Sequence, residues 1–189
     1  EVAAELLQTL EYRGYDSTGA AIQGDAREVD LRKDVGAPSK LVHSLGITKM
    51  QGRVLCGQVR WATFGAVDQE TAQPHVMRCR TYIYGAHNGN VTNCDGLKEE
   101  LVAAGHNVLS DNDGEMVVHS VGEAFAVELE ALSETERLET GARQKAMRRA
   151  IVTAKKRLEG SFAAVVVDPL THTAYAIKAG SSLDFGFGE

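Results

Sequence analysis

Residues 81–87 read TYIYGAH, a short apolar run. Strand-like runs precede it, and a long segment with helical spacing follows it. Two similar runs precede it, GAAIQ at 19–23 and RVLCGQV at 53–59. Two more follow near the end of the chain, FAAVVVD at 162–168 and TAYAIKA at 173–179. Each run has the length of a strand and is bounded by Gly, Asp, Pro or Thr, so we expect five β-strands.

Between the third and fourth runs lie about 70 residues with apolar positions at helical spacing, and the segments 93–106, 114–132 and 141–160 each predict a helix. The polar stretch 131–144 is expected to be a surface connection. A further helix is expected at the start of the chain, with Val2, Leu6, Leu7 and Leu10 on one face. The order helix, strands, helices, strands excludes a regular βαβ repeat and predicts an α+β fold built of packed layers.

The composition is that of an ordinary globular domain. The chain has 189 residues, of which 43% are hydrophobic and 24% charged, with a net charge of -6. A single domain, residues 1–189, is expected from this length. The sequence has no cluster of basic residues that would bind nucleic acid, and no apolar run approaches the roughly 18 residues of a membrane span. We therefore expect neither nucleic acid nor a membrane as a partner. Because the chain opens on Glu1 with a helix already in progress, it is expected to be part of a longer protein.

Cysteine and histidine spacing gives no sign of a metal site. The three cysteines are an odd number without a CxxC pair, which argues against disulfides and zinc and favours a reducing cytoplasm. His43, His106, His119 and His172 fall on separate segments and are expected to be ordinary core or surface residues. No metal or cofactor is therefore expected.

Residues 87–90, HNGN, follow the central apolar run. Asn-Gly is typical of a tight hairpin turn, and a purely structural turn is the first of two interpretations. In the alternative reading, the Asn88 side-chain amide and the Gly89 backbone N–H form a pair of donors that stabilises a developing oxyanion.

Residues 59–65, VRWATFG, place Arg60 beside Trp61, the only tryptophan, at the end of an expected strand. Arg60 could form a surface ion pair while Trp61 fills the core. Alternatively, the guanidinium binds a substrate carboxylate through two parallel hydrogen bonds, and Trp61 walls the pocket.

Residues 110–115, SDNDGE, introduce the second expected helix of the middle block. Acidic residues here cap a helix N-terminus favourably. A calcium loop is excluded, because the positions that require carboxylates hold Leu109 and Ser120. The functional alternative is that Asp113 accepts a substrate ammonium group. Together, a guanidinium that binds a carboxylate, a carboxylate that accepts an ammonium group and two donors to an oxyanion describe a pocket for a free α-amino acid.

The ordered segments LEYRGYDSTG, RWATFG, HNGNVTN, SDNDGE, LEGSFAAVVVD and AGSSL resemble the class II glutamine amidotransferase domain, most closely that of glucosamine-6-phosphate synthase. The resemblance covers essentially the whole chain. It implies a four-layer αββα N-terminal-nucleophile fold that hydrolyses glutamine to glutamate and ammonia. It also implies that the ammonia passes to an acceptor, a sugar phosphate such as fructose 6-phosphate, on a C-terminal domain that follows this chain and through which family members commonly form homodimers.

The resemblance assigns roles to particular residues. It implies that Arg60 binds the glutamine α-carboxylate, with Trp61 and Thr63 as pocket neighbours, and that Asp113 accepts the α-amino group. Asn88 and Gly89 correspond to the oxyanion hole. Arg13 and Asp16 lie in the turn that supports the nucleophile.

The nucleophile of this family is an N-terminal cysteine whose own α-amine is the general base, and it would precede Glu1 by roughly a dozen residues. Cys94 does not replace it, because an internal cysteine has no free α-amine. Two alternatives stay open: a catalytically inactive, glutamine-sensing or structural relative, and a hydrolase with Ser or Thr as its nucleophile. Departures from the family pattern occur at Gln58, Val59, Phe64, Gly114 and Ser182.

Overall fold

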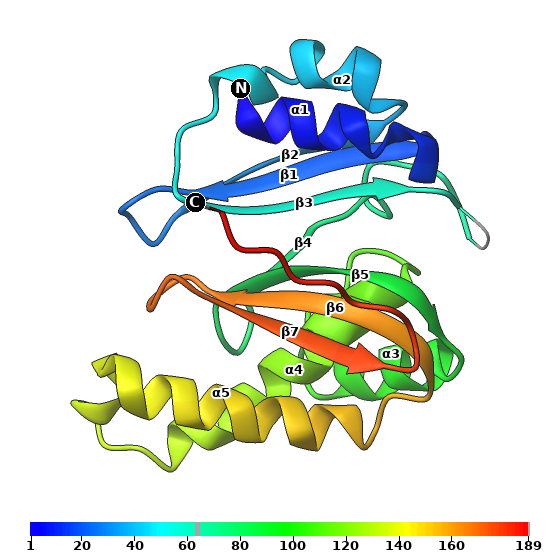
Figure 1. Cartoon of the computed structure of the whole chain (residues 1–189). Coiled ribbons are helices and arrows are strands. Elements are labelled where there is room, and N and C mark those ends of the chain that lie inside the picture. The colour runs from blue at the N-terminus through cyan, green and yellow to red at the C-terminus, as the bar shows by residue number, and fades with distance from the viewer. Residues whose placement is uncertain (63–64, 189) are drawn as a thin grey trace.

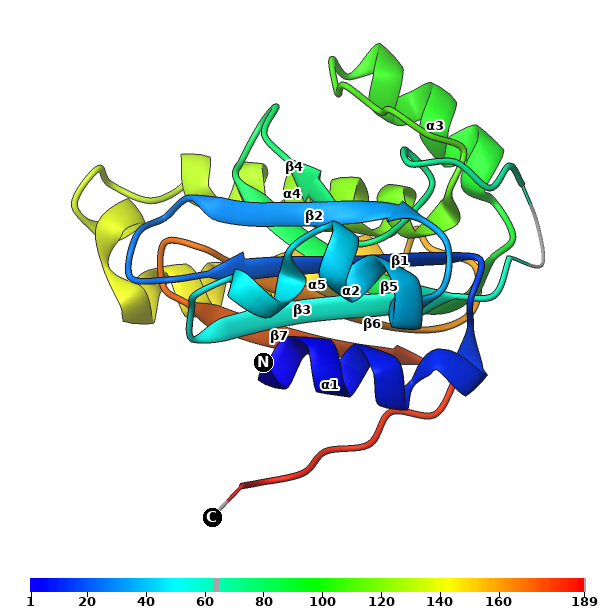
Figure 2. The same ribbon diagram turned by 90° about the horizontal axis from the view of Figure 1, so that it is seen from above.

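The computed structural model describes residues 1–62 and 65–188 and shows two antiparallel sheets packed face to face, with helices on both outer sides (Figure 1). Helices α1 (Val2–Thr9) and α2 (Pro38–Ser44) cover one sheet, as the view from above shows (Figure 2). Helices α4 (Asp113–Glu130) and α5 (Thr140–Lys155) cover the other, and α3 (Cys94–Ala103) packs beside α4. The expected four-layer αββα architecture is confirmed.

The first sheet has the strand order β2 (Val29–Val35), β1 (Ser17–Gln23), β3 (Val54–Arg60). The second has the order β4 (His75–Met77), β5 (Ile83–Val91), β6 (Gly160–Asp168), β7 (Thr173–Ala179). The five expected strands are all present. Strands β2 and β4 were not anticipated.

Among the described residues, three hydrophobic cores hold the layers together: one under α1 and α2, one between the sheets, and the largest between the second sheet and the helical block. A polar link crosses between the sheets at the buried Gln23. Its Nε2 donates to the carbonyl of Pro169 at 2.7 Å, and the hydroxyl of Tyr84 donates to its Oε1 at 3.4 Å. Because both sheets are fixed to each other, the strand ends at their edges can hold side chains in a defined arrangement.

Helix α1 is present as expected, but the face that carries its large apolar side chains is not the buried one. The helix buries Ala3, Ala4 and Leu7, whereas Val2, Leu6 and Leu10 are exposed. Small alanines let the helix approach the first sheet closely, so the buried face is not the one with the largest side chains.

The expectation for the histidines is wrong. His106 and His119 do not lie apart, since their Nδ1 atoms are 2.9 Å from each other.

The connection between α4 and α5 is shorter than expected, because α5 already begins at Thr140; a 3₁₀ turn, Glu136–Leu138, lies within it. In the part of the chain that the structure describes, no helix combines the length and apolar character needed to cross a membrane.

Candidate active site

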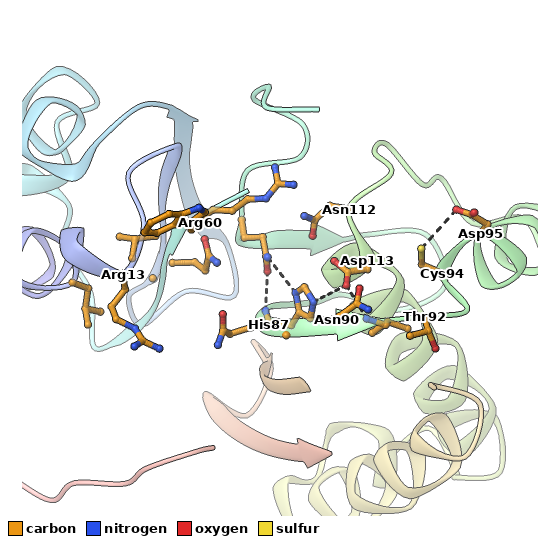
Figure 3. Close-up of a pocket in the computed structure, with 18 residues that line it drawn as sticks. Arg13, Arg60, His87, Asn90, Thr92, Cys94, Asp95, Asn112 and Asp113 are labelled. Carbon is orange, nitrogen blue, oxygen red and sulfur yellow. Dashed lines mark hydrogen bonds and ion pairs between the residues drawn. The ribbon is translucent and has the colours of Figure 1, made fainter. Parts of the chain in front are cut away.

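A cavity of about 560 Å³ lies where the ends of β3 and β5 meet the start of α4 (Figure 3). Segments far apart in the sequence line it: the turn before β1, the end of β3, the end of β5, and the first residues of α3 and α4. Among its lining residues are Arg13, Arg60, Trp61, Asn88, Gly89 and Asp113. These are six of the eight residues that the sequence singled out. Asp16 lies next to this cavity, and Thr63 lies outside the described residues.

Arg60, the last residue of β3, is almost fully buried at 8% exposure. One terminal nitrogen of its guanidinium donates to the carbonyl of Ala66 at 3.0 Å and to Oγ1 of Thr71 at 3.1 Å. These bonds fix the guanidinium at the cavity wall, so the reading of Arg60 as a surface ion-pair residue is wrong.

Trp61 is 57% exposed, and its ring centroid lies 5.5 Å from that of Tyr15. The alternative that Trp61 fills the core is therefore wrong. Trp61 and Tyr15 instead form a half-exposed aromatic pair at the rim of the cavity.

The turn before β1 is held against the end of β3. A Cβ atom on Gly14 would lie 2.4 Å from the carbonyl carbon of Arg60, so only glycine permits this approach. The backbone N–H of Asp16 donates to the carbonyl of Arg60 at 3.0 Å, and its Oδ2 accepts from the N–H of Ala62 at 2.8 Å. Asp16 thus fixes the backbone on both sides of Trp61, while Arg13 faces the cavity.

Asn88 and Gly89 lie within the end of β5, which continues to Val91 in register with β6. The HNGN segment is therefore not a hairpin corner. Gly89 has φ +134°, and a Cβ atom there would lie 2.3 Å from the carbonyl oxygen of Ser161. The strand thus has a local backbone conformation that glycine permits, at the edge of the cavity.

Asp113 is the first residue of α4, and its Oδ2 accepts a hydrogen bond from the N–H of Val91 at 2.9 Å. The same oxygen lies 3.1 Å from Nε2 of the buried His87 (Figure 3). Gln73 in turn contacts Nδ1 of His87 at 3.2 Å and accepts from its backbone N–H at 2.8 Å. Since the Gln73 amide nitrogen can only donate to Nδ1, the ring proton of a neutral His87 lies on Nε2, toward Asp113.

Burial by itself would raise the pKa of Asp113, but the contact with His87 and the hydrogen bond from Val91 outweigh it, so the pKa lies below the ordinary value. Asp113 is an anion at a helix N-terminus, where the helix dipole also favours negative charge. The capping role belongs to its neighbour Asn112, whose Oδ1 accepts from the N–H of Gly114 at 2.9 Å.

Cys94 lines the same cavity. Partial burial and the nearby charges of Asp95 and Asp113 raise the pKa of its thiol. Because the thiolate is the nucleophilic form, this environment does not activate Cys94.

Sequence reasoning missed three residues of the site: Gln73, His87 and Asn112. All three are buried polar residues, and their role is to position Asp113 and the start of α4. A signal was available for Asn112, since Asn before an apolar helical pattern is a typical N-cap. The contact between Gln73 and His87 could not be predicted, because their separation in the sequence matches no known motif.

The arrangement offers a guanidinium and a carboxylate at different walls of one cavity, with a strand end between them. Opposite charges of this kind fit a zwitterion, the form of a free α-amino acid at neutral pH.

Comparison with known proteins agrees with this chemistry. A family profile described as "Glutamine amidotransferase domain" matches residues 59–180. The chain belongs to the glutamine amidotransferase family.

Several curated relatives of this amidotransferase chain carry the name glutamine–fructose-6-phosphate aminotransferase (isomerizing). The relative from Thermococcus kodakarensis is 36% identical over 190 residues, which cover 100% of this chain and 29% of the relative. The relative from Photorhabdus laumondii is 32% identical over 189 residues, covering 100% of this chain and 28% of the relative. The chain thus spans less than a third of the length of these relatives.

Solved structures show the same fold at lower identity. An allosteric regulatory enzyme of purine biosynthesis matches with a TM-score of 0.66 and 21% identity, over 88% of this chain and 32% of that one. The glutamine phosphoribosylpyrophosphate amidotransferase of B. subtilis matches with a TM-score of 0.64 and 21% identity, over 86% of this chain and 31% of that one. The chain therefore shares the fold of these two structures.

One departure of this chain from the family pattern has a structural reason. A Cβ atom at Gly114 would lie 2.4 Å from Nδ1 of His87 and 2.8 Å from Oε1 of Gln73. The absence of a side chain at position 114 therefore leaves the room that the Gln73–His87 pair occupies.

Proposed function

We propose that this chain is a glutaminase domain, which binds free glutamine in the cavity and positions its side-chain carboxamide for hydrolysis to glutamate and ammonia. The observation that carries the proposal is the meeting of Arg60, Asp113 and the Asn88–Gly89 strand end around one cavity. Membership of the glutamine amidotransferase family supports it.

In this proposal, Arg60 binds the α-carboxylate and Asp113 the α-ammonium group. A compound that lacks either group loses a charge-assisted hydrogen bond, so the two residues together select a free amino acid. Trp61 closes one side of the pocket, and Thr63 is its neighbour. Arg13 and Asp16 support the segment against which the nucleophile rests.

The nucleophile in the proposal is an N-terminal cysteine of the full-length protein. Its thiolate attacks the carboxamide carbon, and the oxyanion accepts hydrogen bonds from the Asn88 amide and the Gly89 N–H. Collapse of the tetrahedral intermediate breaks the C–N bond, and the protonated nitrogen leaves as ammonia. Water then adds to the thioester and releases glutamate and the free thiol.

The acceptor is proposed from the relatives. Because this chain spans about 28% of their length, we propose that residues 1–189 form one domain and that a further domain receives the ammonia. We propose fructose 6-phosphate, which their shared name contains, as the acceptor, and amino-sugar synthesis as the purpose of the reaction. We also propose that the full-length protein forms a homodimer through that further domain.

The first experiment combines the N-terminal sequence and intact mass of the purified full-length protein with its release of glutamate from glutamine. A processed N-terminal cysteine with turnover supports the proposal. An N-terminal Ser or Thr with turnover would identify another nucleophile. Glutamine binding without turnover would identify an inactive, glutamine-sensing relative.

The role of Arg60 is tested by the variant Arg60→Lys, which keeps the positive charge but loses the planar fork. We expect KM for glutamine to rise about tenfold or more, with a smaller change in kcat. The matched control is Arg53→Lys at the other end of the first sheet, where the side chain is 81% exposed. Unchanged glutamine kinetics in a folded Arg60→Lys protein would remove Arg60 from the site.

A further inference from the structure

A second cluster of reactive side chains lies apart from the cavity. Sγ of Cys79, Nδ1 of His106 and Nδ1 of His119 all lie within 4.8 Å of one another. Cys79 is in the turn between β4 and β5, His106 follows α3, and His119 is in the second turn of α4. None of the three lines the proposed glutamine cavity.

The three atoms are spaced almost as ligands of one metal ion. A tetrahedral zinc ion with bonds of about 2.3 Å to sulfur and 2.0–2.1 Å to nitrogen separates S from N by about 3.5 Å and N from N by about 3.4 Å. The observed Sγ–Nδ1 distances are 3.3 Å to His106 and 3.8 Å to His119, and the two Nδ1 atoms are 2.9 Å apart. An opening of about half an ångström between the two rings therefore completes the geometry.

The far sides of both rings face carboxylates. Nε2 of His106 lies 2.9 Å from Oε2 of Glu123, and Nε2 of His119 lies 3.6 Å from Oε1 of Glu115. An ionised carboxylate only accepts hydrogen bonds, so a neutral ring facing it carries its proton on Nε2. Both Nδ1 atoms then present lone pairs to the same point. Carboxylates behind the ligating imidazoles are the usual partners that orient histidines in metal sites.

Two lone pairs 2.9 Å apart repel each other unless a positive charge lies between them. The Cys79 thiol can donate its single proton to only one of the two nitrogens. A metal cation satisfies both nitrogens and the sulfur at once, and two imidazoles with one thiolate form a ligand set that suits zinc.

We propose that Cys79, His106 and His119 bind one zinc ion, with water as the fourth ligand. Cys79 is exposed, so water reaches the open position from solvent. On binding, the sulfur coordinates as a thiolate and its proton passes to solvent. The surrounding charges are Glu115 and Glu123, together with Arg80, whose side chain contacts Glu123 at 3.4 Å.

The ion would join three segments that the sequence keeps apart. It would fix the β4–β5 turn and the residue after α3 to α4, the helix that begins with Asp113. Glu115, behind His119, also accepts from the N–H of Leu109 at 2.8 Å and that of Ser110 at 2.7 Å. Zinc binding would therefore stabilise the loop that precedes the proposed ammonium acceptor.

The test measures metal binding directly. The full-length protein is stripped with a chelator, and zinc stoichiometry and affinity are measured by titration, with cobalt(II) as a spectroscopic substitute. We expect one zinc ion that is absent in Cys79→Ser, and a thiolate-to-cobalt charge-transfer band that this variant also loses. Cys94→Ser is the matched control and keeps both signals.

The histidine ligands and their orienting carboxylate have separate tests. His119→Gln is expected to weaken zinc binding by about 100-fold or more, and Glu123→Gln by about tenfold, whereas the exposed His43→Gln leaves it unchanged. Zinc should also raise the melting temperature of the wild-type protein but not that of Cys79→Ser.

Equal zinc stoichiometry in the wild-type protein and in Cys79→Ser would overturn the proposal. So would a cobalt spectrum without the thiolate band, because Cys79 would then not be a ligand of the bound metal. A variant that fails to fold is replaced by alkylation of Cys79 in the folded wild-type protein, which must abolish the zinc site.

Discussion

His87 and Asp113 meet at the wall of the cavity, with Nε2 of the histidine 3.1 Å from Oδ2 of the aspartate. The contact joins the second sheet to the first turn of α4. It holds an ionised carboxylate in position while the rest of that carboxylate remains available to a ligand, since the side chain is 20% exposed.

Replacing this carboxylate by an amide should weaken glutamine binding. Asp113→Asn keeps an oxygen that can accept from Val91 but removes the charge, and hydrogen bonds to charged groups contribute about 1.5–3 kcal/mol. We expect KM for glutamine to rise about 10- to 100-fold in a glutamate-release assay. Asp111→Asn, on an exposed side chain two residues earlier, is the control and should behave as the wild type. Equal kinetics of the two variants would contradict the ammonium-acceptor role.

Gly89→Ala should destabilise the protein, because the new Cβ would lie 2.3 Å from the Ser161 carbonyl oxygen and 2.5 Å from Cα of Phe162. The strained φ adds to this clash. Gly96→Ala, in α3, meets nothing within 4 Å and should be neutral or stabilising by up to about 1 kcal/mol. The measurement is the melting temperature of both variants. Similar melting temperatures would contradict the prediction and show that β5 relaxes around the alanine.

The buried ion pair between Arg143 and Asp168 gives a stability prediction outside the site. Two parallel hydrogen bonds of 2.9 Å join the guanidinium to the carboxylate. Arg143→Met leaves Asp168 as an uncompensated buried charge, and we expect a loss of about 3–5 kcal/mol in the free energy of unfolding. Arg149→Met, on the same helix as Arg143, breaks a more exposed pair with Glu128 of α4 and should cost less than about 1 kcal/mol. Denaturant titrations that rank the two variants in the opposite order would contradict this reading.

The buried His75 is expected to lower the stability of the folded protein in acid. Burial, together with the nearby charge of Lys33, lowers its pKa from 6.5 to about 3. Between these two values the unfolded chain binds a proton that the folded protein excludes, so the free energy of unfolding falls as the pH falls below about 6.5. The loss from this group reaches about 2 kcal/mol at pH 5, at about 1.4 kcal/mol per pH unit.

The measurement is denaturant unfolding of the wild type and His75→Gln between pH 7.5 and pH 5. The variant should be less stable at neutral pH but show a shallower decline. His43→Gln, on an exposed residue of α2, should keep the wild-type slope. Identical slopes in the wild type and His75→Gln would remove His75 as a source of the acid sensitivity.

The fold was largely predictable from the sequence, and the exceptions have physical reasons. Strand β2, VDLRKDV, is mostly half-exposed and carries four charged residues, so apolar content does not reveal it. Strand β4 has three residues and forms because β5 offers it a partner. Such strands are specified by pairing rather than by local pattern.

The candidate site was predicted in its charged and glycine-rich parts, because each lies in a distinctive local motif. Gln73 and His87 were missed because their roles depend on contacts across the fold. The Cys79, His106 and His119 cluster was missed for the same reason: its members are separated by 27 and 13 residues and share no short spacing pattern.

The pairing of β5 with β6 has a kinetic consequence. The two strands meet directly, from Tyr84 with Val167 to Val91 with Gly160, although the whole block α3–α5 lies between them in the chain. Contacts of such sequence separation form slowly, because the entropy of closing a long loop is lost before the contacts stabilise the chain. We therefore expect Asn88 and Gly89 to reach their native positions late in folding, after the helices, so that ligand-binding competence is acquired at the end of the folding reaction.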